Sequence, residues 1–481
     1  MIRRAVRFLD ARAGASPLLR RTLRYVFPDH WSFLLGEIAL YCFLILVATG
    51  TYLALFFDPS HAQVVSHGSY APLDGLPVSR QFQSTVDISF KVTAGLLMRQ
   101  THHWAALVFL VAITLHLFRI FFTGAFRKPR ELNYMVGLTM LALALLEGYA
   151  GYSLPDDLLS GMGLVIGYSV ALSIPVVGAS VATLVWGGRF PGAEEFWSRL
   201  YIVHVLVLPV LIGALIAVHL VLIARPRHTD FPAPGRTERR VRGTPLWPGY
   251  ALRSGGLFLA TAAVLVLLGG LVQINPVWQW GPFHTYLSTN GAQPDWYLGW
   301  LIGALRLMPP IEPHVFGYTL FPNPFFGGVL FPMMVFGLLY AWPWLERRLT
   351  RDHAVHHLLD RPRDRPRRTA LGAAFFGFVA VIFLAGSADR IFLAFGIPYE
   401  GQIWFFRAAV FWVPVAAYWL TRRVCEELRD LDAHPLRGWR GRVVRRTEAG
   451  GFAPAGASTP PADGAPATAR PGAGPARPGA D

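Results

Sequence analysis

Four histidines in two long apolar segments form the strongest chemical pattern of the sequence. His102 and His116 are fourteen residues apart in the first segment, and His204 and His219 are fifteen residues apart in the second. A single histidine in such a segment is most often a buried, hydrogen-bonded side chain. Ionisable groups inside a membrane are costly and usually functional, however, so two matching pairs favour metal ligation over a structural role.

The spacing places both histidines of a segment on one helix face at two depths. Fourteen residues at 1.5 Å per residue separate the two depths by about 21 Å. At 100° per residue, fourteen steps return to within about 40° of the starting face, and fifteen steps overshoot it by about 60°. Neutral imidazoles from two such helices supply both axial ligands of a haem. We expect two haems, one at each depth, and treat His103 as a neighbour that points away.

Glycines in two other apolar segments repeat the fourteen-residue spacing. They are Gly36 and Gly50 in the first, and Gly137 and Gly151 in the second. Glycine lacks a side chain and lets a flat macrocycle or a backbone approach closely. We predict that these glycines make room for the haems at each depth.

Three arginines lie within five residues of the histidines: Arg99, Arg119 and Arg199. A guanidinium group pairs well with a carboxylate such as a haem propionate, which is the role we predict. Ordinary exposure of long basic side chains at the ends of membrane spans is the competing interpretation.

The composition places these segments in a membrane. Of 481 residues, 53% are hydrophobic and only 15% are charged, and apolar runs long enough to cross about 30 Å of hydrocarbon recur along the chain. The net charge of +15 comes largely from short loops beside these runs, which indicates membrane topology and not nucleic-acid binding. The two cysteines, with no Cys-x-x-Cys-His motif, exclude covalent haem attachment, so the haems are b-type.

Nine apolar segments are candidate membrane spans, of which we expect eight to cross. The candidates are residues 31–57, 95–122, 132–154, 161–188, 197–224, 250–274, 325–345, 371–388 and 402–420. If 161–188 does not cross, all the arginine-rich loops fall on the side of the amino terminus, which the positive-inside rule makes the cytoplasm. Pro175 also interrupts that segment. Spans two and four are then parallel, so His102 faces His204 near the outer surface and His116 faces His219 near the inner surface.

The predicted protein is therefore all-α, with eight transmembrane helices of which the first four form a di-haem four-helix bundle. We expect a sequence of five regions: a basic cytoplasmic surface segment at 1–30, the bundle at 31–224 with outer-face helices at 157–190, a basic cytoplasmic loop at 225–249, a C-terminal four-helix region at 250–425, and a disordered cytoplasmic tail rich in Pro, Ala and Gly at 426–481.

The residues above, with three further motifs, resemble cytochrome b of the quinol–cytochrome c oxidoreductase (cytochrome bc) family. The motifs are GYSLP at 151–155, PDWY at 294–297 and PNPFFGGVLFP at 322–332, and the resemblance covers roughly residues 25 to 425. The spacing between His204 and His219 is similar to that of Gram-positive relatives. The loop RHTDFPAPGRTE at 227–238 looks like the actinobacterial branch.

The resemblance implies a function. The family oxidises quinol, here menaquinol, at an outer site, and passes one electron to a Rieske iron–sulfur protein. The other electron crosses through the two haems to an inner site that reduces quinone, which contributes to proton translocation. It also implies that the protein lies in a bacterial cell membrane and forms a homodimer within a larger complex that contains a cytochrome c-type subunit. With eight spans and a cytoplasmic amino terminus, we expect both termini in the cytoplasm, and we expect no nucleic-acid partner.

The resemblance assigns the outer site to PDWY. Asp295 stands where the family usually has glutamate and is expected to accept a quinol proton, with Tyr297 and Tyr152 nearby and with Pro294 and Trp296 lining the site. A carboxylate beside apolar walls can act in this way, although Pro and Asp also suit the start of a helix.

Two positions depart from the family pattern. The family's Pro-Trp-Gly is here Pro155-Asp156-Asp157, which affects the shape of the outer site. At the inner site the usual Lys-Asp pair is here Arg253-Ser254, so we consider His228 and Asp230 as proton donors, against their being solvated loop residues.

Two other classes of protein remain open at this point. A simpler di-haem quinone-reactive membrane anchor of another oxidoreductase would need only four or five spans. A haem-free transporter would use the histidines as proton relays.

Overall fold

The described part of the chain falls into two compact units. The computed structural model describes residues 8, 10–12, 22–68, 70–240, 242–288, 293–433, 444–446 and 452–454. The first unit is Met1–Cys425 and the second is Glu426–Asp481. Most of the predicted surface segment at 1–30 and most of the predicted disordered tail lie outside the described residues.

Eight helices of the described chain are long and apolar enough to cross a membrane. They are Trp31–Ala54, Gly95–Thr123, Glu131–Tyr152, Glu194–Ala224, Leu246–Leu271, Asn323–Thr350, Pro366–Gly386 and Tyr399–Leu431. Each coincides with one of the eight spans expected from the sequence. The all-α architecture with eight membrane helices is confirmed.

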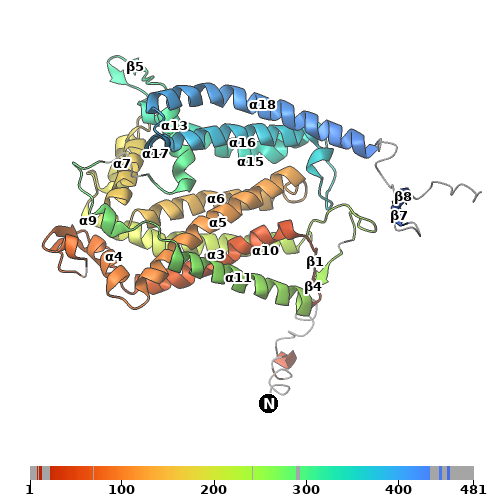
Figure 1. The fold of residues 1–481 in the computed structure, drawn as a ribbon, viewed down its shortest axis with the longest axis horizontal. Coiled ribbons are helices and arrows are strands. Elements are labelled where there is room, and N and C mark those ends of the chain that lie inside the picture. Colours follow the sequence, from red (N-terminus) through yellow and green to blue (C-terminus); the bar gives the residue numbers. More distant parts are fainter. Residues whose placement is uncertain are drawn as a thin grey trace, which may run out of the picture. The chain divides into compact units, whose positions relative to one another are not determined.

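The spans are built from long helices and joined by short ones (Figure 1). The long helices are α3 (Leu34–Ala54), α5 (Gly95–Thr123), α6 (Glu131–Tyr152), α9 (Glu194–Ile202) with α10 (Leu208–Ala224), α11 (Ala251–Leu271), α15 (Phe331–Thr350), α16 (Pro366–Gly386) and α18 (Tyr399–Ala433). The short ones are α4 (Arg80–Phe90), α7 (Leu158–Leu172), α8 (Gly178–Trp186), α12 (Val277–Trp280), α13 (Gly299–Leu307), α14 (Asn323–Phe325) and α17 (Ala388–Phe395).

Short strands, 3₁₀ turns and π-helical turns complete the described elements. The antiparallel strand pairs are β1 (Val26–Phe27) with β4 (Thr244–Pro245), β2 (Gln63–Val65) with β3 (Pro77–Ser79), β5 (His314–Val315) with β6 (Tyr318–Thr319), and β7 (Val444–Arg446) with β8 (Phe452–Pro454). The 3₁₀ turns are Trp31–Phe33, Ala71–Leu73, Trp296–Leu298 and Pro362–Asp364, and the π turns are Val203–Val207, Leu246–Tyr250 and Phe326–Leu330.

The fourth of the nine apolar candidates, residues 161–188, does not cross. It is divided into α7, which has 15 residues, and α8, which has 9. At 1.5 Å per residue, α7 is about 22 Å long, which is less than the hydrocarbon thickness of a bilayer. The chain turns between the two helices around Pro175. Asp157 caps α7 by accepting a hydrogen bond from the Ser160 backbone N–H, which ties its start to the preceding loop.

The helices α3, α5, α6 and α11 share a core, and α10 packs on α6. The closest packing is between α3 and α5, and α11 packs on both (Figure 1). Small residues dominate this core and let the helix backbones approach closely; they include Ala39, Cys42, Ala105, Ala112 and Ala144. The two histidine-bearing spans are thereby held in one bundle.

A second packed group positions the loop that carries PDWY. The short helix α13 follows this motif and packs closely on α16, and α18 completes their core. A side chain at Gly303 of α13 would overlap the carbonyl oxygen of Ile382 on α16, so glycine is needed for this approach. The contact fixes the residues just before α13.

A π-helical turn accounts for the fifteen-residue spacing of the second histidine pair. The turn covers Val203–Val207 and contains His204. A π turn accommodates one more residue than the same length of α-helix. The extra residue between His204 and His219 is absorbed there, so the two histidines keep the relation of a fourteen-residue spacing, within about 40° of one helix face.

Candidate functional site

The four histidines lie in two pairs at opposite ends of the bundle. The ring centroids of His102 and His204 are 6.3 Å apart, and those of His116 and His219 are 6.5 Å apart. Imidazole nitrogens bind a metal ion at about 2 Å, so two rings on opposite sides of one ion have their centres about 6 Å apart. Both spacings fit a shared ion. We call the two ends of the bundle the His102 end and the His116 end.

Each of the four glycines faces one of these histidine rings. A side chain at Gly50 would lie 3.0 Å from His102 Cε1, and one at Gly36 would lie 3.2 Å from His116 Cε1. Gly151 is more crowded, since a Cβ added there would overlap the ring of His204 and lie 2.9 Å from its Nε2. At Gly137 the corresponding distance, to His219 Cε1, is 3.9 Å.

The second ring nitrogens have side-chain partners at one end only. His102 Nδ1 lies 3.0 Å from the hydroxyl of Thr49, and His204 Nδ1 lies 3.0 Å from a carboxylate oxygen of Glu147. Among the described residues, Nδ1 of His116, His204 and His219 has no hydrogen-bond partner. Glu147 therefore approaches His204 as a neighbouring charge, and only the Thr49 contact is a hydrogen bond. Hydrogen bonding of the second nitrogen orients a ligating imidazole and makes it more basic.

Two of the three arginines are buried with free nitrogens. In Arg99 and in Arg119, Nε and Nη2 are buried and have no hydrogen-bond partner among the described residues. Unpaired buried guanidinium nitrogens are costly, so these groups suit an anionic ligand such as a propionate. Arg199 is exposed, which agrees with a basic side chain at the end of a span.

The PDWY loop lines a cavity at the His102 end. The cavity has a volume of about 480 Å³, and Pro294, Asp295 and Trp296 contribute to its wall. Asp295 Oδ2 lies 2.8 Å from Nε2 of His103, which lines the same cavity. The structure therefore places a carboxylate and an imidazole in contact at the edge of an apolar pocket.

Both tyrosines expected at this site are buried nearby. Burial, followed by the Asp295 carboxylate, raises the pKa of Tyr297 well above its ordinary value of 10, so this phenol stays protonated. Tyr152 donates a hydrogen bond of 2.7 Å to the carbonyl of Leu159 at the start of α7. Neither tyrosine belongs to the cavity wall: Tyr297 lies against the Asp295 carboxylate, and Tyr152 is engaged with the backbone.

The two aspartates that depart from the family pattern bind the chain itself. Asp156 accepts a hydrogen bond of 2.6 Å from Ser79 and lies 3.3 Å from His61 Nδ1. Asp157 caps α7 and is fully buried. Burial raises the pKa of Asp157 to about 6, against smaller opposing effects of Ser160 and Arg99. Asp156 and Asp157, at the position where the family has Pro-Trp-Gly, therefore connect the loop after α6 with the segment around Ser79 and with the start of α7.

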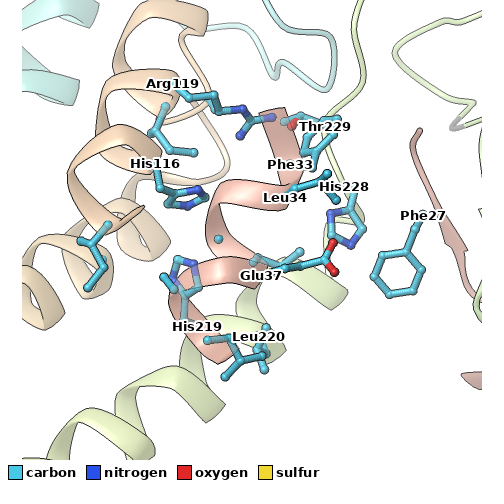
Figure 2. A pocket seen from close by; sticks show the side chains of 18 of the residues that line it. Phe27, Phe33, Leu34, Glu37, His116, Arg119, His219, Leu220, His228 and Thr229 are labelled. Atoms are coloured by element: carbon cyan, nitrogen blue, oxygen red, sulfur yellow. The ribbon is translucent and has the colours of Figure 1, made fainter. Parts of the chain in front are cut away.

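A larger cavity of about 840 Å³ lies at the His116 end. His116, His219, Gly36, Gly137 and Arg119 line it. Figure 2 shows the rings of His116 and His219 turned toward one another, with α3 passing beside them.

The inner-site candidates take different places around this cavity. Arg253 and His228 line it, but Arg253 forms an ion pair of 2.9 Å with Asp29. Asp230 is not among the residues of its wall and is buried in an ion pair of 2.6 Å with Arg236.

Three polar residues at these sites are not among the residues predicted for them from the sequence. The spacing predicts that His103 points away from the ligands, yet it contacts Asp295. Glu37 and Glu147 lie within the first and third spans and were not singled out. A lone carboxylate inside an apolar span is costly, and that signal was present in the sequence.

Comparison with known proteins gives a consistent result. A family model described as cytochrome b (N-terminal)/b6/petB matches residues 107–282. The cytochrome b subunit of the cytochrome bc1 complex of Mycobacterium bovis is 48% identical over 446 residues, which cover 92% of this chain and 81% of the relative. The subunit of the same name from Streptomyces coelicolor is 43% identical over 450 residues, covering 93% and 82%. That from Corynebacterium diphtheriae is 44% identical over 428 residues, covering 89% and 79%.

A solved structure shares the fold. A chain of a structure titled hyperthermophilic respiratory Complex III superimposes with a TM-score of 0.65 at 21% identity. The match covers 87% of this chain and 99% of the other.

Proposed function

This chain belongs to the family of cytochrome b subunits of the cytochrome bc1 complex, and from that premise we propose that it oxidises menaquinol at the His102 end and reduces quinone at the His116 end. Its role as the membrane cytochrome b of a quinol–cytochrome c oxidoreductase follows from relatives that match over nine-tenths of its length. These matches include the C-terminal spans, which a four- or five-span anchor would lack. A haem-free transporter does not account for them either.

Two b-type haems are proposed between the histidine pairs. The observation that carries this proposal is the coincidence, at each end, of two facing imidazoles with a glycine opposite each ring. Arg99 and Arg119 have buried free nitrogens that would pair with the propionates. When bound, the haems carry single electrons from one end of the bundle to the other.

The residues of the His102 end are suited to take protons from a quinol. Asp295 and His103 are in contact at the wall of the cavity, so a quinol hydroxyl placed there can give its proton to this pair. Tyr297, which stays protonated, lies against the Asp295 carboxylate and would position it. One electron would leave to a Rieske iron–sulfur protein and the other would cross the bundle.

The charged loops support a cytoplasmic His116 end. Arg130 donates hydrogen bonds to the backbone carbonyls of His356 and Arg227, so three arginine-rich loops meet at this end. Basic loops of this kind favour the cytoplasm in bacterial membrane proteins. Quinol oxidation would then release protons outside and quinone reduction would consume protons inside, with both termini cytoplasmic.

The proposed partners follow from the family. The relatives are subunits of a cytochrome bc1 complex by name. We propose that this chain assembles with a Rieske protein and a cytochrome c-type subunit, as a homodimer in the bacterial cell membrane.

Optical and redox measurements on the purified complex test the proposal. The reduced-minus-oxidised spectrum should show b-type haem, and a redox titration should resolve two centres for each copy of this chain. Co-purification of an iron–sulfur protein would support the bifurcated path. A complex that contains no b haem would overturn the proposal.

A further inference from the structure

A group of polar side chains in the wall of the larger cavity has no role in the proposal so far. The group consists of Glu37 and Tyr41 on α3, Tyr250 in the π turn before α11, and Ser254 on α11. Glu37, Tyr250 and Ser254 line the cavity together with His116 and His219. In Figure 2 the Glu37 carboxylate extends from α3 toward the side where His228 and Phe27 lie.

Three hydroxyl groups hold the Glu37 carboxylate in place. Tyr250 donates a hydrogen bond of 2.5 Å to Oε1, and Ser254 donates one of 2.8 Å to Oε2. Tyr41 donates a further bond of 3.2 Å to Oε2 and is itself in contact with the hydroxyl of Ser254. The donors come from two different spans, so the carboxylate is fixed where α3 and α11 meet. Ionisable groups at such positions are usually functional.

Two other ionisable groups of the wall, His228 and Arg253, are less suited to deliver a proton. Burial, followed by the charges of Arg119 and Arg130, lowers the pKa of His228 to about 4, so this ring is neutral near neutral pH. A neutral ring of low basicity does not readily carry an additional proton. Arg253 is a permanent cation and cannot act as an acid.

Water reaches the mouth of the cavity close to this group. The side chains of Asp29 and Arg253 are 48% and 66% exposed, form an ion pair, and both belong to the cavity wall. Arg253 directly precedes Ser254, which bonds Glu37. The carboxylate therefore lies between an aqueous entrance and the space beside the histidine pair.

We propose that Glu37 is the acid that protonates a quinone reduced in this cavity, and that Tyr41, Tyr250 and Ser254 are positioning residues for it. The inference rests on the proposed function, in which the cavity is the quinone-reduction site.

The proposed step is balanced as follows. The quinone takes up two electrons, one from each of two quinol oxidations at the His102 end, and two protons from the aqueous phase. One proton passes through Glu37, whose O–H bond breaks as the O–H bond of the nearer quinone oxygen forms. The Glu37 carboxylate then regains a proton from water at the mouth of the cavity.

Glu37→Gln tests the acid role in the intact complex. Glutamine keeps the size of the side chain and can accept hydrogen bonds but cannot deliver a proton as an acid. Both proteins carry Asp295→Asn, which slows the delivery of electrons from quinol to the haems. Oxidation of the pre-reduced haems by a short-chain 1,4-naphthoquinone should then be about 10²-fold slower with Glu37→Gln than without it. The affinity of the oxidised complex for this naphthoquinone should stay the same, and Glu37→Asp should recover part of the rate.

Infrared spectroscopy provides a readout independent of turnover. The difference spectrum recorded on naphthoquinone reduction should contain a carboxyl band that is absent in Glu37→Gln. Tyr250→Phe and Ser254→Ala should shift this band and slow the reaction less than Glu37→Gln does. A purely structural role for these hydroxyls predicts no change in the band.

The control is Glu131→Gln, which makes the same change at the same end of the molecule. Glu131 lies 3.6 Å from Arg347 and outside the cavity wall, so this variant should behave as wild type. The inference is overturned if Glu37→Gln, with both haems bound, oxidises its haems as fast as Glu131→Gln. If Glu37→Gln does not assemble, Glu37→Asp and Tyr250→Phe decide by the same rate and infrared measurements. A wild-type complex without b haem would overturn the proposed function instead.

Discussion

The two ends of the bundle are built from the same parts and differ in what surrounds them. At the His102 end, Thr49 and Glu147 lie against the second nitrogens of the two histidines. At the His116 end these nitrogens have no side-chain partner, and a cavity of about 840 Å³ opens directly beside the rings. The smaller cavity of the His102 end is lined by His103 instead of His102 or His204.

The difference teaches how one repeated motif can serve two reactions. A carboxylate against a ligating imidazole makes the ligand more basic and favours the oxidised iron. Arg99 and Arg119 lie near the two pairs alike, so Glu147 is the charge that distinguishes the ends. Electrons should therefore move from the His102 end to the His116 end. Proton acceptors lie at the first end and proposed proton donors at the second, which matches that direction.

The largest expected effect comes from removing one histidine of each pair. His102→Ala and His116→Ala should each bind one haem in place of two, because one axial ligand is lost at one end only. Both variants should stop electron transfer across the bundle. Haem content for each complex and a redox titration give the measurement, and retention of two haems in either variant would refute the pairing.

A second test addresses the proton acceptor of the His102 end alone. Asp295→Asn should slow quinol oxidation by about 10²- to 10⁴-fold, since the amide cannot accept a proton, and should leave both haems bound. Single-turnover reduction of the haems by menaquinol is the measurement. Asp58→Asn, an exposed position outside the cavity wall, is the matched control. Equal rates in the two variants would contradict the role of Asp295.

Substitutions of two buried aspartates, Asp157 and Asp230, allow the stability of the two ends of the bundle to be compared. The raised pKa of Asp157 means that its folded carboxyl binds a proton more tightly than the unfolded one. Its stabilising contribution is complete below about pH 4 and is lost as the pH rises through about 6. Asp157→Asn keeps the cap and should be more stable than wild type at neutral pH by about 2–3 kcal/mol.

Asp230→Asn breaks the buried ion pair with Arg236 and should be less stable than wild type by about 3 kcal/mol.

Thermal unfolding of the detergent-solubilised complex at a series of pH values measures both effects. A pH dependence in Asp157→Asn equal to that of wild type would show that this carboxyl is not the titrating group.

The glycines allow a matched comparison of crowding. Gly151→Ala would place a methyl group into the ring of His204, whereas Gly137→Ala would make ordinary contact with His219 at 3.9 Å. Gly151→Ala should cost about 1–3 kcal/mol and lower the haem content, and Gly137→Ala should be tolerated. Haem content and the unfolding temperature of the two variants decide. Equal behaviour would mean that the two ends are equally crowded.

The smallest expected effect is electrochemical. Glu147→Gln removes the negative charge beside His204 and should raise the reduction potential of the haem at that end by about 60 mV or less, a tenfold change in a one-electron equilibrium at most. The potential at the other end should stay unchanged. A redox titration that shifts both centres equally would argue against a local effect.

The sequence predicted most of the architecture because membrane spans obey simple rules. Apolar length and the positions of arginines were enough to exclude residues 161–188 as a span, and the boundaries of the first seven spans agree to within about five residues. The eighth span was predicted to end at 420, whereas the helix continues to Leu431. The pairing of His102 with His204 then follows from the direction of the spans.

The contacts between distant segments could not be predicted in the same way. Spacing along one helix indicated that His103 points away from His102, but it gave no information about Asp295, which approaches from another span. The hydroxyl donors of Glu37 could not be predicted for the same reason, because Tyr250 and Ser254 come from the fifth span, although a lone carboxylate in an apolar span marks Glu37 itself. The pattern of one helix reveals which side chains share a face but not what packs against that face.

The π turn at His204 has a consequence for how this family can change during evolution. Gaining or losing a single residue in an α-helix normally rotates everything beyond it, and in a ligand-bearing helix that would destroy the site. A local widening of the helix confines the change to one turn, so the remaining side chains keep their neighbours. A span that contains such a turn can therefore hold fourteen or fifteen residues between its two histidines with the same side-chain neighbours.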